Sequence, residues 1–290
     1  MKHKFFKRCL PCCSPLSHVL RAGLVLGAVC CLVLALGSCG GQTETETASH
    51  SDLPVILVGS DNYPPFHYED ANGQPTGIDV DLAQEACRRL GYRPEFHQVV
   101  WENKDHELEM GNIDCLWGSF TMTGREDLYQ WAGPYLYSRQ VVLVRADSDI
   151  TTLADLAGKR VAVQATSKPE TVFLERPEPE RVPEVGEVYC FSTMEEVYSA
   201  IRKDFVDAIA GHEGAMRTFM EDSPGSWRIL DQSLLVSGLG VAFPKGTNES
   251  LSAQLTAVLQ EMQKDGTTKA IVEKYGFDPD QFFLGRGGSS

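Results

Sequence analysis

The pattern of apolar and polar residues along the chain predicts short strands that alternate with amphipathic helices. Val55–Val58 is an apolar run that ends at Gly59, which is typical of a buried strand. From Ile78 to Leu90 apolar residues recur every four positions, acidic residues occupy the first turn, and Gly91 follows, so this segment is predicted to be a helix. Asn72-Gly73 is a strong hairpin signal between the two elements.

The same alternation continues to the C-terminal part of the chain. Further strands are predicted at 113–117, 140–145, 160–163 and 206–210, and a late amphipathic helix at 251–262 ends at Gly266. Thr193 with Glu196 forms a capping box, which predicts a helix start. The stretch 174–187 is rich in proline and glutamate and is expected to be a solvated loop. This arrangement favours an α/β fold.

The N-terminus indicates export. Residues 1–21 are basic, residues 22–36 are uncharged and apolar, and Leu36-Gly37-Ser38-Cys39 follows. This order is typical of a secretory signal peptide, predicted at 1–38. The tetrapeptide resembles the lipobox of bacterial lipoproteins, which implies a lipid on Cys39; the alternative is an uncleaved anchor helix. Residues 39–51 are predicted to be a flexible tether. Both alternatives place the following domain outside the membrane.

The net charge and the positions of the cysteines argue against nucleic-acid-binding and metal-binding functions. The formal net charge is -14, and residues 1–38 contribute only positive charge, so the remainder is more acidic still. This argues against a nucleic-acid partner. Five of nine cysteines precede residue 38, and the Cys9, Cys12 and Cys13 cluster lacks a second ligand pair, so neither a metal nor a cofactor is expected. Without Cys39 three cysteines remain, which allows one disulfide at most; Cys87 and Cys115 are predicted to be core residues.

Three stretches carry a resemblance to a known family. They are Gly77–Leu82 preceded by Pro64–Phe66; Gly111–Asp114 followed by Thr121–Arg125 and Gly133–Tyr135; and Gly240–Gly246. Together they resemble the family 3 bacterial solute-binding proteins, which bind polar amino acids for ABC importers, over about 52–276.

The resemblance implies a periplasmic-binding-protein-like fold of type II, with two α/β lobes joined by a two-stranded hinge. By position, lobe 1 takes 52–137 and 241–290, lobe 2 takes 138–240, and the crossings lie near 137–140 and 237–240. The expected partners are a small amino-acid-like ligand in the cleft, the permease subunits of an ABC importer, and the membrane through the lipid anchor. The protein is expected to be a monomer.

The carboxylate of such a ligand would be held mainly by Arg125, because a guanidinium binds a carboxylate in a bidentate manner. A surface arginine is the alternative. The resemblance adds the hydroxyl and amide of Thr121 and the carbonyl of Ser119. Because the segment is one residue shorter than in the family, Thr123 competes with Thr121. From the second lobe it implies exposed amides at Thr166, Ser167 and Lys168, where a helix begins.

Aromatic and acidic positions complete the expected site. Tyr63 and Trp101 align with aromatic residues that enclose the ligand side chain, and Asp61 lies at the cleft mouth. The ammonium partner is normally an aspartate, but this chain has His212 and Glu213 there. Counting residues along the chain puts His212 at the position of the family's aspartate. The chemistry favours Glu213, since a carboxylate matches an ammonium and histidine is mostly neutral at pH 7. Both are retained as candidates.

Two other function classes are weighed against binding. A periplasmic dehydratase acting on an arogenate-like compound could use Asp61, His212 or Glu213 as acid or base. A receptor sensor module is the other, but no kinase or cyclase segment follows. No independent catalytic motif is found, so the sequence favours a binding protein over an enzyme.

Overall fold

The computed structural model describes residues 53–283 of the 290-residue chain. The expected signal peptide, the tether and the lipid on Cys39 lie outside the described residues. Within residues 53–283, no helix has the length and apolar character needed to cross a membrane.

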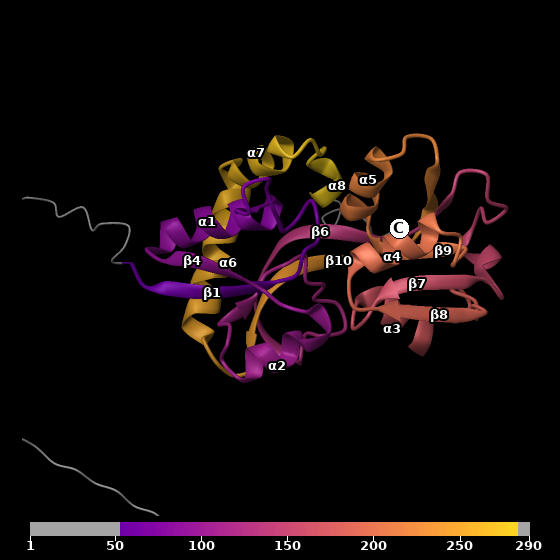
Figure 1. The fold of residues 1–290 in the computed structure, drawn as a ribbon. Helices are drawn as coiled ribbons and strands as arrows, with labels where there is room; N and C mark the ends of the chain where they lie inside the picture. Colours follow the sequence, from indigo (N-terminus) through magenta and orange to yellow (C-terminus); the bar gives the residue numbers. More distant parts are fainter. Residues whose placement is uncertain (1–52, 284–290) are drawn as a thin grey trace, which may run out of the picture. The chain divides into compact units, whose positions relative to one another are not determined.

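The described chain is built on one eight-stranded mixed sheet with the strand order β4-β1-β5-β10-β6-β9-β7-β8 (Figure 1). The strands are β1 (Val55–Ser60), β4 (Arg93–Gln98), β5 (Cys115–Leu116), β6 (Tyr129–Arg145), β7 (Arg160–Gln164), β8 (Glu187–Phe191), β9 (Ala208–His212) and β10 (Trp227–Pro244). A separate hairpin pairs β2 (Tyr68–Glu69) with β3 (Pro75–Thr76), as the Asn72-Gly73 signal predicts. The predicted strand at 206–210 is found two residues later, as β9.

Two long strands, β6 and β10, run through both halves of the sheet. They pair antiparallel along their length, and Ser138 and Tyr137 of β6 lie opposite Ser237 and Gly238 of β10. On one side of this crossing β10 pairs with β5, and on the other side β6 pairs with β9. Strands β1, β4 and β5 therefore belong to a first lobe and β7, β8 and β9 to a second (Figure 1). The expected fold of two α/β lobes that share two crossing strands is confirmed.

Helices cover the sheet in each lobe. They are α1 (Ile78–Leu90), α2 (Lys104–Glu109), α6 (Glu249–Lys264), α7 (Thr267–Lys274) and α8 (Asp280–Phe283) from the segments before β6 and after β10, and α3 (Lys168–Glu175), α4 (Met194–Arg202) and α5 (Glu213–Glu221) between β6 and β10. Two short 3-10 turns, η2 (Trp101–Asn103) and η3 (Leu153–Leu156), precede α2 and β7.

Local signals in the sequence set the helix boundaries. The helix α1 buries its repeating apolar face and ends at Gly91, which has a φ of 76°. The capping box of Thr193 and Glu196 begins α4, and Gly266, at a φ of 85°, separates α6 from α7. Cys87 and Cys115 are buried free thiols, as predicted.

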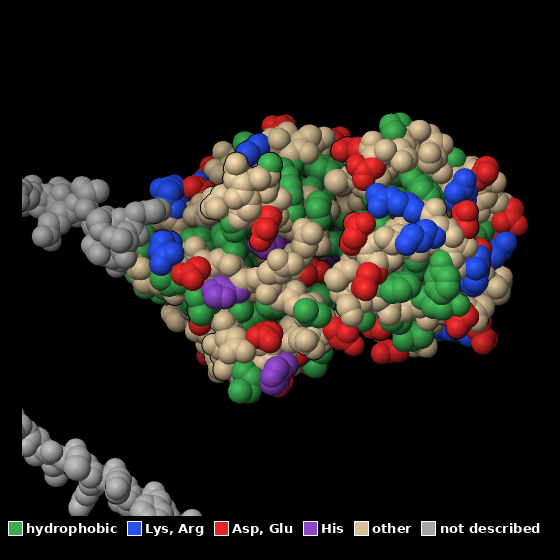
Figure 2. Space-filling model, in the orientation of Figure 1, with side chains coloured by type: hydrophobic (Ala, Val, Ile, Leu, Met, Phe, Trp, Pro, Cys, Tyr) green, Lys and Arg blue, Asp and Glu red, His purple; other side chains and the backbone are tan. Residues whose placement is uncertain are grey.

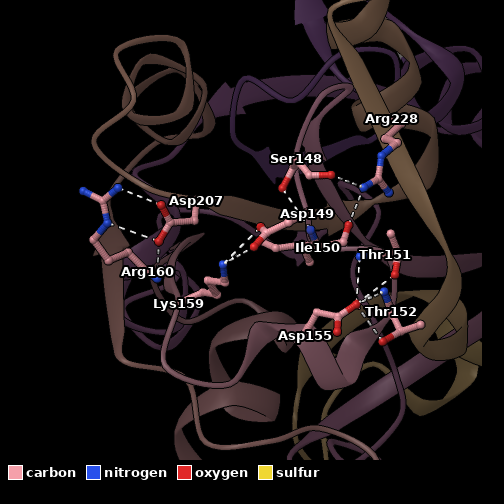
Figure 3. A network of polar contacts seen from close by, with 10 residues as sticks. All are labelled: Ser148, Asp149, Ile150, Thr151, Thr152, Asp155, Lys159, Arg160, Asp207 and Arg228. Atoms are coloured by element: carbon pink, nitrogen blue, oxygen red, sulfur yellow. Dashed lines mark hydrogen bonds and ion pairs between the residues drawn. The ribbon is translucent and has the colours of Figure 1, made fainter.

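Oppositely charged side chains form ion pairs on the surface of the second lobe, where β7 begins (Figure 3). Arg160 binds Asp207 at 2.7 Å, and Lys159 donates to both oxygens of Asp149 at 3.1 Å. Asp155 accepts hydrogen bonds from the backbone and hydroxyl groups of Thr151 and Thr152. Acidic and basic side chains are likewise interspersed over both lobes on the face seen in Figure 2.

Candidate functional site

A small polar cavity lies between the lobes and is lined by side chains from both. It leaves about 30 Å³ for the centres of water molecules, which is room for about two of them. Nine of the twelve residues proposed from the sequence line it: Asp61, Tyr63, Trp101, Ser119, Thr121, Arg125, Ser167, Lys168 and His212. Thr123, Thr166 and Glu213 do not.

Direct hydrogen bonds join the lobes around this cavity. Gln164 Nε2 donates to Asp61 Oδ2 at 2.6 Å, and Lys104 Nζ donates to Thr166 Oγ1 at 3.1 Å. The His212 backbone N–H donates to the Tyr63 hydroxyl at 3.1 Å. Together with the small cavity volume, these bonds describe a closed arrangement of the two lobes.

Arg125 lies between the lobes rather than in a surface ion pair. Its Nη1 donates to the Thr121 carbonyl at 3.3 Å, and its Nη2 donates to the Thr166 carbonyl of the second lobe at 2.9 Å. The guanidinium lies 5.1 Å from the centroid of the Phe120 ring. These contacts fix the plane of the guanidinium at the cavity wall, where it can receive an anionic group.

The chain segment that carries Ser119 and Thr121 is held by α1. Asp79, in the first turn of that helix, accepts a hydrogen bond from the Ser119 N–H through Oδ2 at 2.5 Å. Ser119 has a φ of 46°, a conformation that costs energy for a residue with a side chain, so the bond stabilises a strained loop. Burial raises the pKa of Asp79 to about 7. In the sequence, Asp79 is only one of the acidic residues in the first turn of the predicted helix, and its positioning role was not predicted.

The two threonines differ in placement. Thr121 lines the cavity, and its hydroxyl accepts a hydrogen bond from Gln140 Nε2 at 3.3 Å. The hydroxyl of Thr123 instead lies 2.8 Å from that of Ser237, on the crossing strand β10, and Thr123 is not among the cavity-lining residues. Geometry therefore favours Thr121.

Two of the three amides expected from the second lobe, those of Thr166 and Ser167, are already bonded within the protein. The Thr166 N–H donates to Glu170 Oε2 at 2.7 Å, and the Ser167 N–H donates to the Gln164 carbonyl at 3.3 Å. Both donors are thus used within the protein, because Glu170 in the first turn of α3 folds back over the loop. The second lobe instead offers the side chains of Ser167 and Lys168 to the cavity.

The preference for Glu213 is corrected. Glu213 opens α5, and its carboxylate bonds to Arg217 at 2.6 Å and to Arg139 at 3.2 Å, outside the cavity lining. His212, the last residue of β9, lines the cavity. The side chains of these two neighbours have different surroundings because β9 ends and α5 begins between them. A choice based on charge alone could not predict this difference.

The His212 ring is neutral and is fully engaged by the crossing strand β6. Its Nδ1 lies 2.9 Å from Ser138 Oγ, and its Nε2 lies 2.9 Å from Gln140 Nε2. Burial, with a further contribution from Arg125, lowers the pKa of His212 to about 3. A neutral ring that accepts from Gln140 at Nε2 and donates from Nδ1 to Ser138 satisfies both contacts.

Asp61 is the acidic group of the cavity wall. Its Oδ2 is bonded to Gln164, whereas within residues 53–283 no other residue donates a hydrogen bond to Oδ1. Burial raises the pKa of Asp61 to about 6, against the opposing effects of Gln164 and Lys104. Gln164 and Lys104 were not identified from the sequence; a polar residue at the end of the buried β7 was the available signal for Gln164.

Two aromatic residues close the cavity from the first lobe. Tyr63 is buried against Phe66 with ring centroids 6.0 Å apart. Trp101 packs edge-on against Phe120 at 5.1 Å, and Lys104 Nζ lies 5.5 Å from the Trp101 ring. The cavity thus combines aromatic rings from the first lobe with fixed polar groups from both lobes, as small-molecule sites do.

Comparisons with known proteins agree with this architecture. The family model of the bacterial extracellular solute-binding proteins, family 3, matches residues 55–278. A histidine-binding periplasmic protein of Salmonella typhimurium is 30% identical over 262 residues, which cover 87% of this chain and 96% of that protein. An L-cystine-binding protein of Escherichia coli is 26% identical over 264 residues, covering 90% and 97%.

Solved structures give the same match. An ancestral arginine-binding protein bound to arginine superposes with a TM-score of 0.69 at 29% identity, covering 76% of this chain and 97% of that one. An ancestral amino-acid-binding protein described as a precursor of cyclohexadienyl dehydratase superposes with a TM-score of 0.67 at 27% identity, covering 76% and 95%.

Proposed function

The chain belongs to family 3 of the bacterial extracellular solute-binding proteins, and we propose that it captures an amino acid or amino-acid-like zwitterion between its lobes for an ABC importer. The observation that carries this proposal is Arg125, whose guanidinium lies in the interlobe cavity and contacts the loops of both lobes. The relatives that are named for binding histidine, cystine and arginine support a ligand of this kind.

The charges of the cavity support a ligand with two charged ends. Arg125 offers a cation and Asp61 an anion, and both line one enclosed space. A charged group that is buried without a partner costs several kcal/mol, so a ligand that pairs both groups is favoured over a neutral one. The surrounding Tyr63 and Trp101 rings exclude water and strengthen each pairing.

Delivery to an importer fits an anchored, extracytoplasmic monomer. We infer that Cys39 carries a lipid on the outer side of the membrane and that the polar segment 39–51 links it to the folded domain. Lobe 1 is proposed to comprise 52–137 with 241–290, and lobe 2 138–240. The crossings near 137–140 and 237–240 would then act as the hinge on which the lobes close around the ligand and present it to the permease subunits.

The proposal is tested by a binding screen on the purified mature chain. Thermal unfolding is recorded with each common L-amino acid and with related ω-amino and guanidino carboxylates. A ligand at a hundred times its dissociation constant should add about 2.7 kcal/mol to the free energy of unfolding. Stabilisation by at least one carboxylate, lost in the variant Arg125→Ala, is the expected result. No stabilisation by any of them would contradict the proposal.

An enzymatic function is the second candidate, because Asp61 has a pKa near neutrality and could transfer a proton. The ancestral precursor of a dehydratase on the same scaffold is the reason to test it. Incubation of the protein with arogenate and with prephenate, followed by chromatography of the products, distinguishes the two functions. The binding proposal expects no phenylalanine or phenylpyruvate above the uncatalysed background.

A further inference from the structure

The carboxylate end of the proposed site lacks an acidic partner for a nearby ammonium. An α-amino acid carries its ammonium nitrogen about 2.5 Å from its carboxylate carbon, since only the α-carbon separates them. If the carboxylate binds Arg125, the ammonium must find its partner close to that guanidinium. Asp61 is the one carboxylate among the described cavity-lining residues.

The groups that border Arg125 do not supply that partner. His212 is close enough for Arg125 to act on its titration, but both ring nitrogens of His212 are engaged, with Ser138 and Gln140. The carboxylate of Glu213 is turned to Arg139 and Arg217 instead. Asp105 and Glu170 act electrostatically on Arg125, but neither lines the cavity. Asp105 is bonded to Lys104, and Glu170 accepts the Thr166 N–H.

Further positive charge surrounds the same end. Lys168 lines the cavity, and its Nζ lies against the backbone of Gly124, so that a Cβ atom on Gly124 would be 2.8 Å from it. Burial and the charge of Arg125 lower the pKa of Lys168 and that of the buried Lys104, and the acids that oppose this effect do not line the cavity. A second cation placed beside Arg125 would be repelled rather than paired.

Asp61 supplies the acidic group of the cavity, and its contacts differ from those of Arg125. Asp61 follows β1, is bonded to Gln164 at the end of β7, and responds electrostatically to Lys104. No other described residue donates a hydrogen bond to its Oδ1, which can accept one from a ligand cation. Lys104, and not Arg125, is the cation that acts on the pKa of Asp61, and Asp61 is not among the groups that act on the pKa of Arg125. The anion-binding group and the cation-binding group are therefore assigned to different ends of the cavity.

We propose that the ligand carries its positive charge away from its carboxylate, as an ω-amino or ω-guanidino carboxylate does, and lacks an α-ammonium. This inference rests on the proposed function and specifies its ligand class. The carboxylate binds Arg125 and Lys168, the distal cation binds Asp61, and the position beside His212 receives an uncharged methylene group.

Matched probe pairs test the inference by calorimetric titration. L-arginine is compared with 5-guanidinopentanoate and L-lysine with 6-aminohexanoate, because each pair differs only in the α-ammonium. The analogue without the α-ammonium should bind at least tenfold more tightly in at least one pair. Equal or tighter binding of the α-amino acid in both pairs would overturn the inference.

Variants at position 212 make the test specific to this contact. In His212→Asp the added carboxylate should reverse the preference toward the α-amino acid, whereas His212→Asn, which stays neutral, should keep the original preference. Glu213→Gln serves as the matched control and should leave the preference unchanged. An unchanged preference in a folded His212→Asp variant would overturn the inference.

Failure of the inference is distinguishable from failure of the proposed function. If neither probe pair binds but another carboxylate from the screen does, the inference is wrong and the proposed function stands. If no carboxylate in the screen binds the wild-type protein, both are wrong.

Discussion

Charged side chains have different surroundings at the two ends of the strand β7: they are exposed and paired at one end and buried at the other. At its first residue, Arg160 is paired with Asp207 in the exposed network of Figure 3, where Asp155 also receives several hydrogen bonds from Thr151 and Thr152. These hydrogen bonds, chiefly from the backbone, hold the pKa of Asp155 at about 2. At the last residue of the strand, Gln164, the cavity begins.

In the cavity, burial rather than pairing determines the charge states. Burial raises the pKa of Asp61 to about 6 and lowers that of His212 to about 3. The charged groups of the exposed network are thus paired with one another, whereas those of the cavity are available to pair with a ligand. Perturbed pKa values with opposite signs of this kind are characteristic of functional sites.

The largest effect is expected for Arg125→Ala. Removal of the buried guanidinium leaves the ligand carboxylate without its bidentate partner and should weaken binding by about 2 to 5 kcal/mol, or roughly 30-fold to several thousand-fold. Lys159→Ala, in the exposed network, is the matched control and should retain normal affinity. Isothermal titration of both variants with the ligand from the screen measures the difference. Near-normal affinity in Arg125→Ala would contradict the claim that the buried charges of the cavity, unlike those of the exposed network, bind the ligand.

A smaller effect is expected from pH, and it depends on the charge state of Asp61. Burial has raised its pKa to about 6, so the carboxyl is largely protonated below pH 6 and ionised above it. A ligand cation pairs with the ionised form, so affinity should rise with pH by up to about tenfold per unit below 6 and level off above. Titrations at pH 5, 6 and 7.5 measure this. Asp61→Asn should bind weakly at every pH, with no such slope.

A more modest change is expected for Asp79→Ala. The substitution leaves the buried Ser119 N–H without its acceptor and should lower the free energy of unfolding by about 1 to 3 kcal/mol. Ligand affinity should fall as well, because the loop that carries Thr121 loosens. Asp79→Asn retains an acceptor oxygen of similar shape and should keep most of the affinity. Denaturant unfolding and titration of the two variants report both effects, and equal losses in both would argue against the positioning role.

The smallest effect is expected for Glu213→Gln. Its carboxylate is paired with Arg139 and Arg217 outside the cavity, so the substitution should change ligand affinity less than about threefold. Titration against the same ligand measures this directly. A loss as large as that of Arg125→Ala would restore Glu213 as a ligand partner and contradict its placement.

Much of the fold could be predicted because its signals are local. The helix α1 follows from its four-residue repeat and Gly91, and the β2-β3 hairpin follows from Asn72-Gly73. The two-lobed architecture came from the resemblance carried by motifs such as Gly77–Leu82, since strand order is not encoded by local periodicity.

The site was less predictable because side-chain direction and contacts between the lobes are not local. The choice between His212 and Glu213 depends on where β9 ends, which a one-residue difference decides. Gln164 joins the cavity lining, and Lys104 bonds across the lobes beside it, only when the second lobe meets the first, and no sequence spacing indicates those contacts.

The most direct test of the account is a crystal structure of the mature chain with its ligand bound. The proposed function predicts a ligand between the lobes, with both carboxylate oxygens within about 3 Å of the Arg125 guanidinium and a cation facing Asp61. A ligand bound elsewhere, or one in the cleft whose carboxylate avoids Arg125, would contradict it.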